Sequence, residues 1–129
     1  MSLIAVLSFV AAQTMANPVV GDWTNPAKSV VVQVAPCGLK LCGTVKWASE
    51  TAKNDARRAG TQALVGTEVL QDFKSVRPGH WRGVLFVPDR KVRTRAELIA
   101  VEPDRLRIRA CTGGGLFCKS QLWTRVKVQ

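Results

Sequence analysis

Residues 105–109 read Arg105-Leu106-Arg107-Ile108-Arg109, a strict alternation of cationic and apolar side chains. Successive side chains of a β-strand point to opposite faces, so this stretch is typical of a strand with one face in a core and the other in solvent. Leu106 and Ile108 share the apolar face. The pattern predicts a β-protein whose outer surface is cationic.

Further stretches rich in β-branched and aromatic residues recur along the chain, separated by turns rich in proline, glycine, asparagine and aspartate. They lie at residues 30–34, 44–47, 67–73, 81–87, 92–99 and 121–128. Only residues 48–60 are polar and alanine-rich, which predicts a loop or one or two helical turns. We expect an all-β antiparallel meander of about eight strands, closed into an up-and-down barrel or folded as a sandwich. Closure is favoured because it removes exposed edges.

The amino-terminal segment predicts export. Residues 3–12 form an apolar run too short to span a bilayer, and small residues follow at positions 14 and 16, although no Lys or Arg precedes the run. A buried core strand is the alternative. We therefore expect a secretory signal at residues 1–16, one barrel domain at residues 17–129, and a periplasmic or secreted bacterial protein without a membrane span.

The four cysteines fit an oxidising compartment. Cys37 lies near Cys42, and Cys111 lies near Cys118. Three pairings are open, and the two local disulfides are favoured because each pair flanks a glycine-bearing turn. A zinc site is the competing interpretation, but neither spacing is that of a typical zinc motif, and the one histidine, His80, is remote. We predict no metal and no cofactor.

The charge is strongly positive, with a formal net value of +10 that lies entirely outside residues 1–16. Such a charge favours anionic partners, although a merely charged exterior would look the same. The predicted basic face comprises Arg90, Lys91, Arg93, Arg95, Arg105, Arg107 and Arg109. Nucleic acid is disfavoured, because the basic stretch from Arg77 to Arg109 offers only Trp81 and Phe86, and stacking needs exposed aromatic residues among the charges. An anionic component of the cell envelope remains as a partner.

No catalytic residue is assigned from the sequence. His80 follows Pro78-Gly79 without a recognisable base or nucleophile beside it, which predicts a surface residue. The acids Glu97 and Asp104 lie among arginines and are interpreted as solvated ion pairs. We therefore expect a protein that is not an enzyme.

Several segments, taken together, resemble a known family. Gly21-Asp22-Trp23 and the final Trp123-Thr124-Arg125 resemble the lipocalin signature. The wider succession comprises Pro36-Cys37-Gly38, Leu41-Cys42-Gly43, Leu64-Val65-Gly66, Trp81 with Gly83, Pro88-Asp89, Asp104-Arg105-Leu106, Ala110-Cys111 and the run from Ser120 to Val126. It is similar to a bacterial family of unknown activity, domain of unknown function 2147. The resemblance implies a lipocalin-like, mostly periplasmic barrel, with Arg125 lying across the ring of Trp23.

The chain departs from the family pattern where Arg90 to Thr94 follow Pro88-Asp89, and where residues 57–60 are basic. A ligand bound at these loops would therefore differ here. By analogy with the fold, the leading hypothesis is non-catalytic binding of a small apolar or amphipathic molecule in the envelope. The inward-facing candidates are Val45, Trp47, Val69, Leu85, Val87, Leu98, Leu106 and Ile108. The alternative is a basic module that docks on anionic lipid head groups, lipopolysaccharide or an acidic protein.

Overall fold

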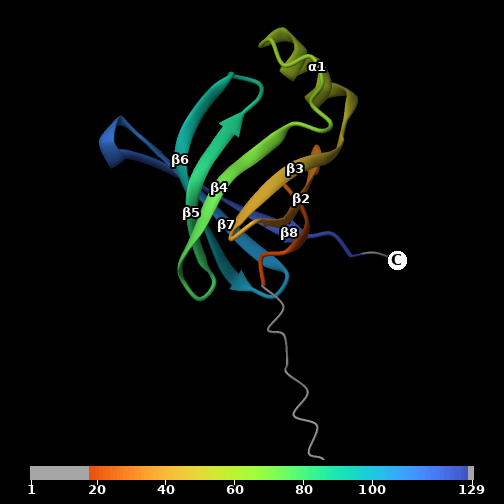
Figure 1. Cartoon of the computed structure of the whole chain (residues 1–129). Helices are drawn as coiled ribbons and strands as arrows, with labels where there is room; N and C mark the ends of the chain where they lie inside the picture. The colour runs from red at the N-terminus through yellow and green to blue at the C-terminus, as the bar shows by residue number, and fades with distance from the viewer. Residues whose placement is uncertain (1–17, 128–129) are drawn as a thin grey trace, which may run out of the picture.

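The computed structural model describes residues 18–127, and the predicted signal segment lies outside them. The described chain forms a closed antiparallel barrel in which each strand pairs with the next and the last pairs with the first (Figure 1). The strands are β1 (Gly21–Thr24), β2 (Val30–Cys37), β3 (Lys40–Ala48), β4 (Glu68–Arg77), β5 (His80–Val87), β6 (Val92–Glu102), β7 (Arg105–Thr112) and β8 (Phe117–Arg125). The predicted barrel is confirmed and the sandwich alternative is not.

The alternating sequence of β7 produces the expected two-sided strand. Leu106 and Ile108 are buried, while Arg105, Arg107 and Arg109 are exposed. Leu98 on β6 faces Ile108 across the ladder, and Trp123 on β8 faces Leu106. The interior is filled by apolar side chains from all round the barrel, and those of Trp23, Phe73, Leu98 and Leu106 are almost completely buried. One hydrophobic core therefore holds the eight strands together.

The polar insertion forms a short helix, α1 (Glu50–Arg58). The Ser49 side chain accepts a hydrogen bond from the Ala52 N–H and so caps the first turn. A hydrogen bond to Lys53 and its positive charge hold the pKa of Glu50 below its usual value. Buried Ala56 packs into the core, and the Thr61 hydroxyl donates to the Pro88 carbonyl. The insertion therefore rests on the β5–β6 turn, at the end of the barrel that we call the α1 end.

The barrel closes through its shortest strand. β1 has four residues and pairs with β8 only at Trp23↔Arg125 and Thr24↔Thr124. The Asn25 side-chain oxygen accepts hydrogen bonds from the N–H groups of Ser29 and Val30, which turns the chain away from β8. Pro26 follows and has no N–H for a ladder. The side-chain hydrogen bonds of Asn25 and the missing N–H of Pro26 thus end the pairing of β1 with β8 after two residue pairs.

Both local disulfides are present, and each one joins neighbouring strands. Cys37–Cys42 links β2 to β3, and Cys111–Cys118 links β7 to β8. The β7–β8 hairpin projects beyond the barrel wall, on the left of Figure 1. The second disulfide therefore clips the base of a hairpin tip that the core does not support.

Candidate functional site

Arg125 organises the end of the barrel opposite α1. Its guanidinium lies 4.4 Å from the centre of the Trp23 ring, the stacking that the resemblance implied. It also donates to the carbonyl oxygens of Pro18 (2.7 Å), Val20 (2.9 Å) and Pro103 (3.1 Å). A Cβ at Gly21 would overlap this guanidinium, so the glycine makes room for it. One side chain thus ties β8, the amino-terminal segment and the β6–β7 turn together.

Two open hollows, of about 480 and 510 Å³, lie at this Arg125 end. The first is lined by Gly21, Asp22, Arg125, Val126 and Lys127. The second is lined by Pro18, Gly79, Arg125 and residues 100–104. Both hollows include Arg125 in their lining. Its guanidinium is already occupied by three backbone carbonyl oxygens and by the ring of Trp23. These hollows are therefore outer surfaces of the closed end and not an entrance to the barrel interior.

Most of the residues predicted to line an internal pocket belong to the core. Leu85 and Val87 are half-buried, and five others are buried, namely Val45, Val69, Leu98, Leu106 and Ile108. Trp47 differs from the expectation, because 50% of its surface is exposed. The β2–β3 register shifts at Val31/Val32, so Val45 pairs with Val32 while Trp47 pairs with outward-facing Val31. This bulge turns the indole out of the barrel.

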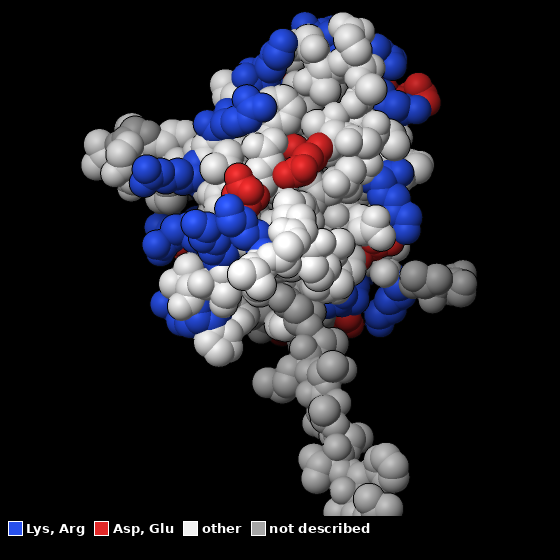
Figure 2. All heavy atoms as spheres, viewed as in Figure 1, with Lys and Arg blue, Asp and Glu red and all other residues white. Residues whose placement is uncertain are grey.

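The predicted basic face is exposed in full. All seven of its residues, Arg90, Lys91, Arg93, Arg95, Arg105, Arg107 and Arg109, lie at the surface. Arg95 lies on β6 and Arg109 lies on the neighbouring strand β7. They are two residue pairs apart along the ladder, because Arg95 pairs with Cys111 and Arg109 pairs with Glu97. Figure 2 shows Lys and Arg side chains gathered along the left of the view and near α1 at the top, with few acids among them. We call the surface formed by these seven residues the cationic wall. It offers anions a broad positive surface on the outside of the barrel.

Within this wall, the guanidinium of Arg93 lies 5.0 Å from the ring centre of Phe86. Phe86 is buried even though it pairs directly with Arg93 across the ladder. The stacked arginine covers an aromatic ring that would otherwise face water, which is a favourable cation–π arrangement. Arg93 thus contributes to the packing of the wall as well as to its charge.

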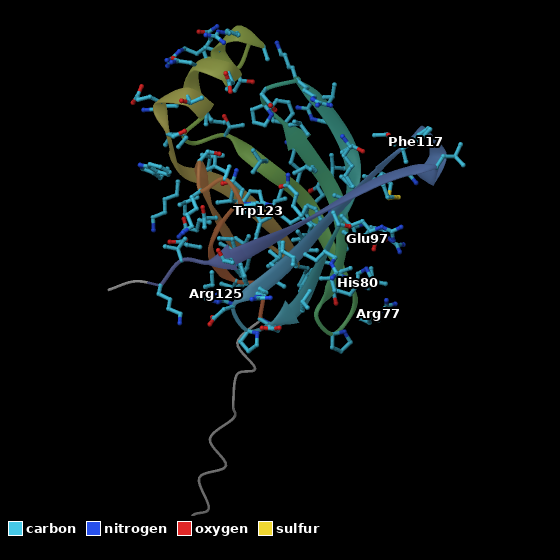
Figure 3. The ribbon with its side chains drawn as sticks, turned by 180° about the vertical axis from the view of Figure 1, so that it is seen from behind. Arg77, His80, Glu97, Phe117, Trp123 and Arg125 are labelled. Carbon is cyan, nitrogen blue, oxygen red and sulfur yellow. A yellow bond between two sulfur atoms is a disulfide. The ribbon has the colours of Figure 1, made fainter. Side chains whose placement is uncertain are left out.

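The prediction for His80 is wrong. Only 8% of its surface is exposed, and its Nε2 lies 3.1 Å from a carboxylate oxygen of Glu97. Arg82 lies 3.6 Å from the other oxygen of Glu97, and Figure 3 places His80 between Glu97 and Arg77. The pair is not evident from the sequence because the two residues are seventeen positions apart. Aligning β5 and β6 about the turn at residues 88–91 would have placed Arg82 opposite Glu97, two residue pairs away from His80 and on the same face of the sheet.

The His80–Glu97 contact joins two neighbouring strands on the outer wall. The hydrogen bond between the imidazole and the carboxylate stabilises the fold, because the buried imidazole would otherwise have an unpaired polar group. In the described part of the chain, no cluster of three or more metal-ligating side chains occurs. The contact is best explained as a polar clasp between β5 and β6.

Of the eight described strands, β8 is the most exposed. Residues 117–122 are all exposed, and Phe117 and Leu116 expose 72% and 82% of their surfaces. Figure 3 shows β8 running from Phe117 at the projecting tip to Arg125 at the closed end. The sequence pattern predicts this strand at residues 121–128, whereas the strand begins at Phe117, so the prediction leaves out the tip. The sequence does contain a signal for this longer strand. Pairing Cys111 with Cys118 across the glycines at residues 113–115 extends the β7–β8 hairpin to Phe117.

These features define a small, disulfide-bonded, antiparallel β-barrel with a filled core and a cationic wall. The architecture is that of a solved Helicobacter pylori protein, HP1028, whose description states that it belongs to the lipocalin family. The two are 13% identical and superpose with a TM-score of 0.62 over 83% of this chain and 82% of that one. At this identity the likeness shows a shared fold.

The chain belongs to a bacterial family described as "Uncharacterized protein conserved in bacteria (DUF2147)", whose model matches residues 21–125. This confirms the family resemblance of the sequence. No curated protein matches the chain. Neither α1 nor the single 3-10 turn at residues 113–115, the two helices among the described residues, is long and apolar enough to cross a membrane.

Proposed function

We propose that this protein is a non-catalytic binding protein of the bacterial cell envelope, and that its cationic outer wall binds anionic envelope components. The single observation that carries the proposal is the wall itself. Alternate residues of β7 are exposed arginines, and no acidic residue occurs between Arg105 and the end of the chain. Two disulfides and a bacterial family support placement in an oxidising, extracytoplasmic compartment.

The ligand chemistry that fits this wall is phosphate-bearing lipid. Guanidinium groups bind phosphate through paired hydrogen bonds as well as charge. Cations that approach an anionic membrane contribute about 1 kcal/mol each. Glycerophospholipid head groups and the lipid A part of lipopolysaccharide present the same groups, so an experiment has to separate them.

The test compares two double variants that change the net charge equally. Arg107→Glu/Arg109→Glu alters the wall, and Arg57→Glu/Arg58→Glu alters the exposed end of α1. Cosedimentation is measured with phosphatidylcholine vesicles that contain or lack phosphatidylglycerol, and separately with lipopolysaccharide, between 25 and 500 mM salt. We expect binding to either anionic surface to weaken steeply with salt. We also expect the wall variant to lose more than tenfold and the helix variant less than threefold.

Equal losses for both variants would show that net charge alone drives binding and would overturn the assignment to the wall. Binding that survives 500 mM salt would point to an apolar contact instead. Retention by only one of the two anionic surfaces would identify the source of the phosphate.

A second candidate is the small apolar or amphipathic ligand of the leading sequence hypothesis. The pleat places Phe117, Lys119 and Gln121 on the same face of the β7–β8 hairpin as buried Ile108 and Leu106, yet all three are exposed. This leaves the interior face uncovered near the α1 end. Native mass spectrometry of protein isolated from its own periplasm tests the idea. A retained small molecule supports it, and a bare mass in repeated preparations contradicts it.

A further inference from the structure

The barrel leaves part of one strand edge without a partner strand. Along β8, pairing with β7 runs from Phe117↔Thr112 to Thr124↔Arg105. On the other side, pairing with β1 begins only at Thr124. Among the described residues, the edge of residues 117–122 therefore faces no strand. A continuous open edge is a template for the addition of another strand.

The backbone groups that face this edge follow from the hydrogen-bond pattern. The N–H of Arg125 donates to Asp104 beside β7, and that of Val126 donates to Asp22 beside β1. Odd-numbered residues therefore point toward β7 and even-numbered ones away from it. The Cα atoms of Cys111 and Cys118 lie 4.1 Å apart, which is typical of a non-hydrogen-bonded pair and gives the same assignment.

Cys118, Ser120 and Leu122 therefore present their N–H and C=O groups to the open edge. Their register with β7 is fixed by the Cys111–Cys118 disulfide, which lies at the edge's outer end. An incoming strand would meet a backbone that is already extended, so less conformational entropy is lost on binding. The backbone of residues 117–122 is therefore preorganised to pair with an added strand.

Charge indicates what kind of strand the edge accepts. Arg107 and Arg109 on β7 and Lys119 on β8 are exposed, and the hairpin carries no acid. Exposed Phe117 and Leu122 supply apolar contacts on opposite faces of the strand. Pairing of two copies through this edge would bring like charges together, which opposes association. An acidic segment with apolar residues meets both requirements.

We propose that the open edge of β8, residues 117–122, binds an extended acidic segment of a partner protein by β-strand addition. The backbone supplies the pairing, Arg107, Arg109 and Lys119 supply charge complementarity, and Phe117 and Leu122 hold apolar side chains. This surface is distinct in chemistry from a lipid-binding wall, because it needs the backbone of its ligand.

The test uses a fluorescein-labelled eight-residue peptide of alternating Glu and Val, followed by fluorescence anisotropy. The matched probe is the same peptide N-methylated at two adjacent central residues, which keeps the charge and blocks both edges of the strand. Ser120→Pro removes one N–H that faces the open edge, and Ser120→Ala keeps it. We expect the methylated peptide and the proline variant each to lose at least tenfold in affinity, and the alanine variant less than threefold.

Circular dichroism and the melting temperature establish whether Ser120→Pro folds; if it does not, the methylated peptide on the unaltered protein decides. Equal affinity for both peptides would overturn strand addition and leave charge alone. A dimer seen by sedimentation and lost in Ser120→Pro would assign the edge to a second copy, which also overturns the proposal. Ser120→Pro leaves the wall arginines in place, so loss of peptide binding with vesicle binding retained separates this edge from the wall.

Discussion

The two ends of β8 differ in almost every respect although they belong to one strand. At the Arg125 end, the strand has neighbours on both sides and an arginine held by a ring and three carbonyl oxygens. At the Phe117 end, it pairs only with β7 and every side chain is exposed. The first end serves stability, and the second leaves backbone and apolar groups free to bind. Cutting β1 short at Asn25 produces this division.

The largest expected effect is at the supported end. Arg125→Ala removes the stacking on Trp23 and the hydrogen bonds to Pro18, Val20 and Pro103. We expect a loss of about 2–4 kcal/mol in the free energy of unfolding. Urea denaturation measures it, with Arg107→Ala as the control that removes an exposed arginine at a cost below about 0.5 kcal/mol. Equal effects of the two variants would remove the distinction between the ends.

The disulfides should have an intermediate effect. Replacing Cys111 and Cys118 by alanine opens a short loop, and we expect a loss of about 2 kcal/mol in stability. Replacing Cys37 and Cys42 should cost a similar amount. Only the first change should also weaken binding of the acidic peptide, because only that bridge fixes the strand register beside the open edge. A matching loss of peptide binding in both variants would contradict this role.

A smaller effect is expected at the polar clasp. Glu97→Gln keeps the shape of the side chain but removes the charge that faces His80 and Arg82. We expect a destabilisation of about 1 kcal/mol at neutral pH, measured by thermal unfolding. Arg82→Gln, which removes only the more distant and exposed partner, should cost about 0.5 kcal/mol or less. A larger loss in the second variant would shift the role from His80 to Arg82.

The smallest effect on stability is expected at the tip. Phe117→Ser removes an aromatic ring that is 72% exposed, so the free energy of unfolding should change by less than about 0.5 kcal/mol. The same change should weaken binding of the acidic peptide severalfold, because the ring would cover its apolar side chains. A large loss of stability would show that Phe117 packs against the barrel.

The sequence was most informative where side chains alternate. The pattern of residues 105–109 predicted both the strand and its exposed arginines, and the cysteine spacing favoured both disulfides. Tertiary register was harder to predict. The bulge that turns Trp47 outward, the partner of His80 and the early departure of β1 each depend on which residues meet across a ladder. The periodicity of one strand does not say which residues of the next strand it meets, and a shift of one residue moves every side chain to the other face.

Barrel closure does not remove every strand edge in this protein. A barrel was favoured because closure removes edges, and the barrel did form. Its last ladder is only two residues long, so part of β8 keeps an edge. Asn25-Pro26 has the composition of a turn, but its consequence for the opposite strand depends on the pairing of Thr24 with Thr124, which lie far apart in the sequence.

Amide hydrogen exchange along β8, followed by NMR, tests the central claim most directly. In the free protein, we predict fast exchange at the N–H groups of Ser120 and Leu122, and slow exchange at Lys119 and Gln121, which face β7, and at Arg125 and Val126. Addition of the acidic peptide should slow Ser120 and Leu122 selectively. Protection of Ser120 and Leu122 in the free protein equal to that of their odd-numbered neighbours would show that the edge is already covered, and would contradict the account.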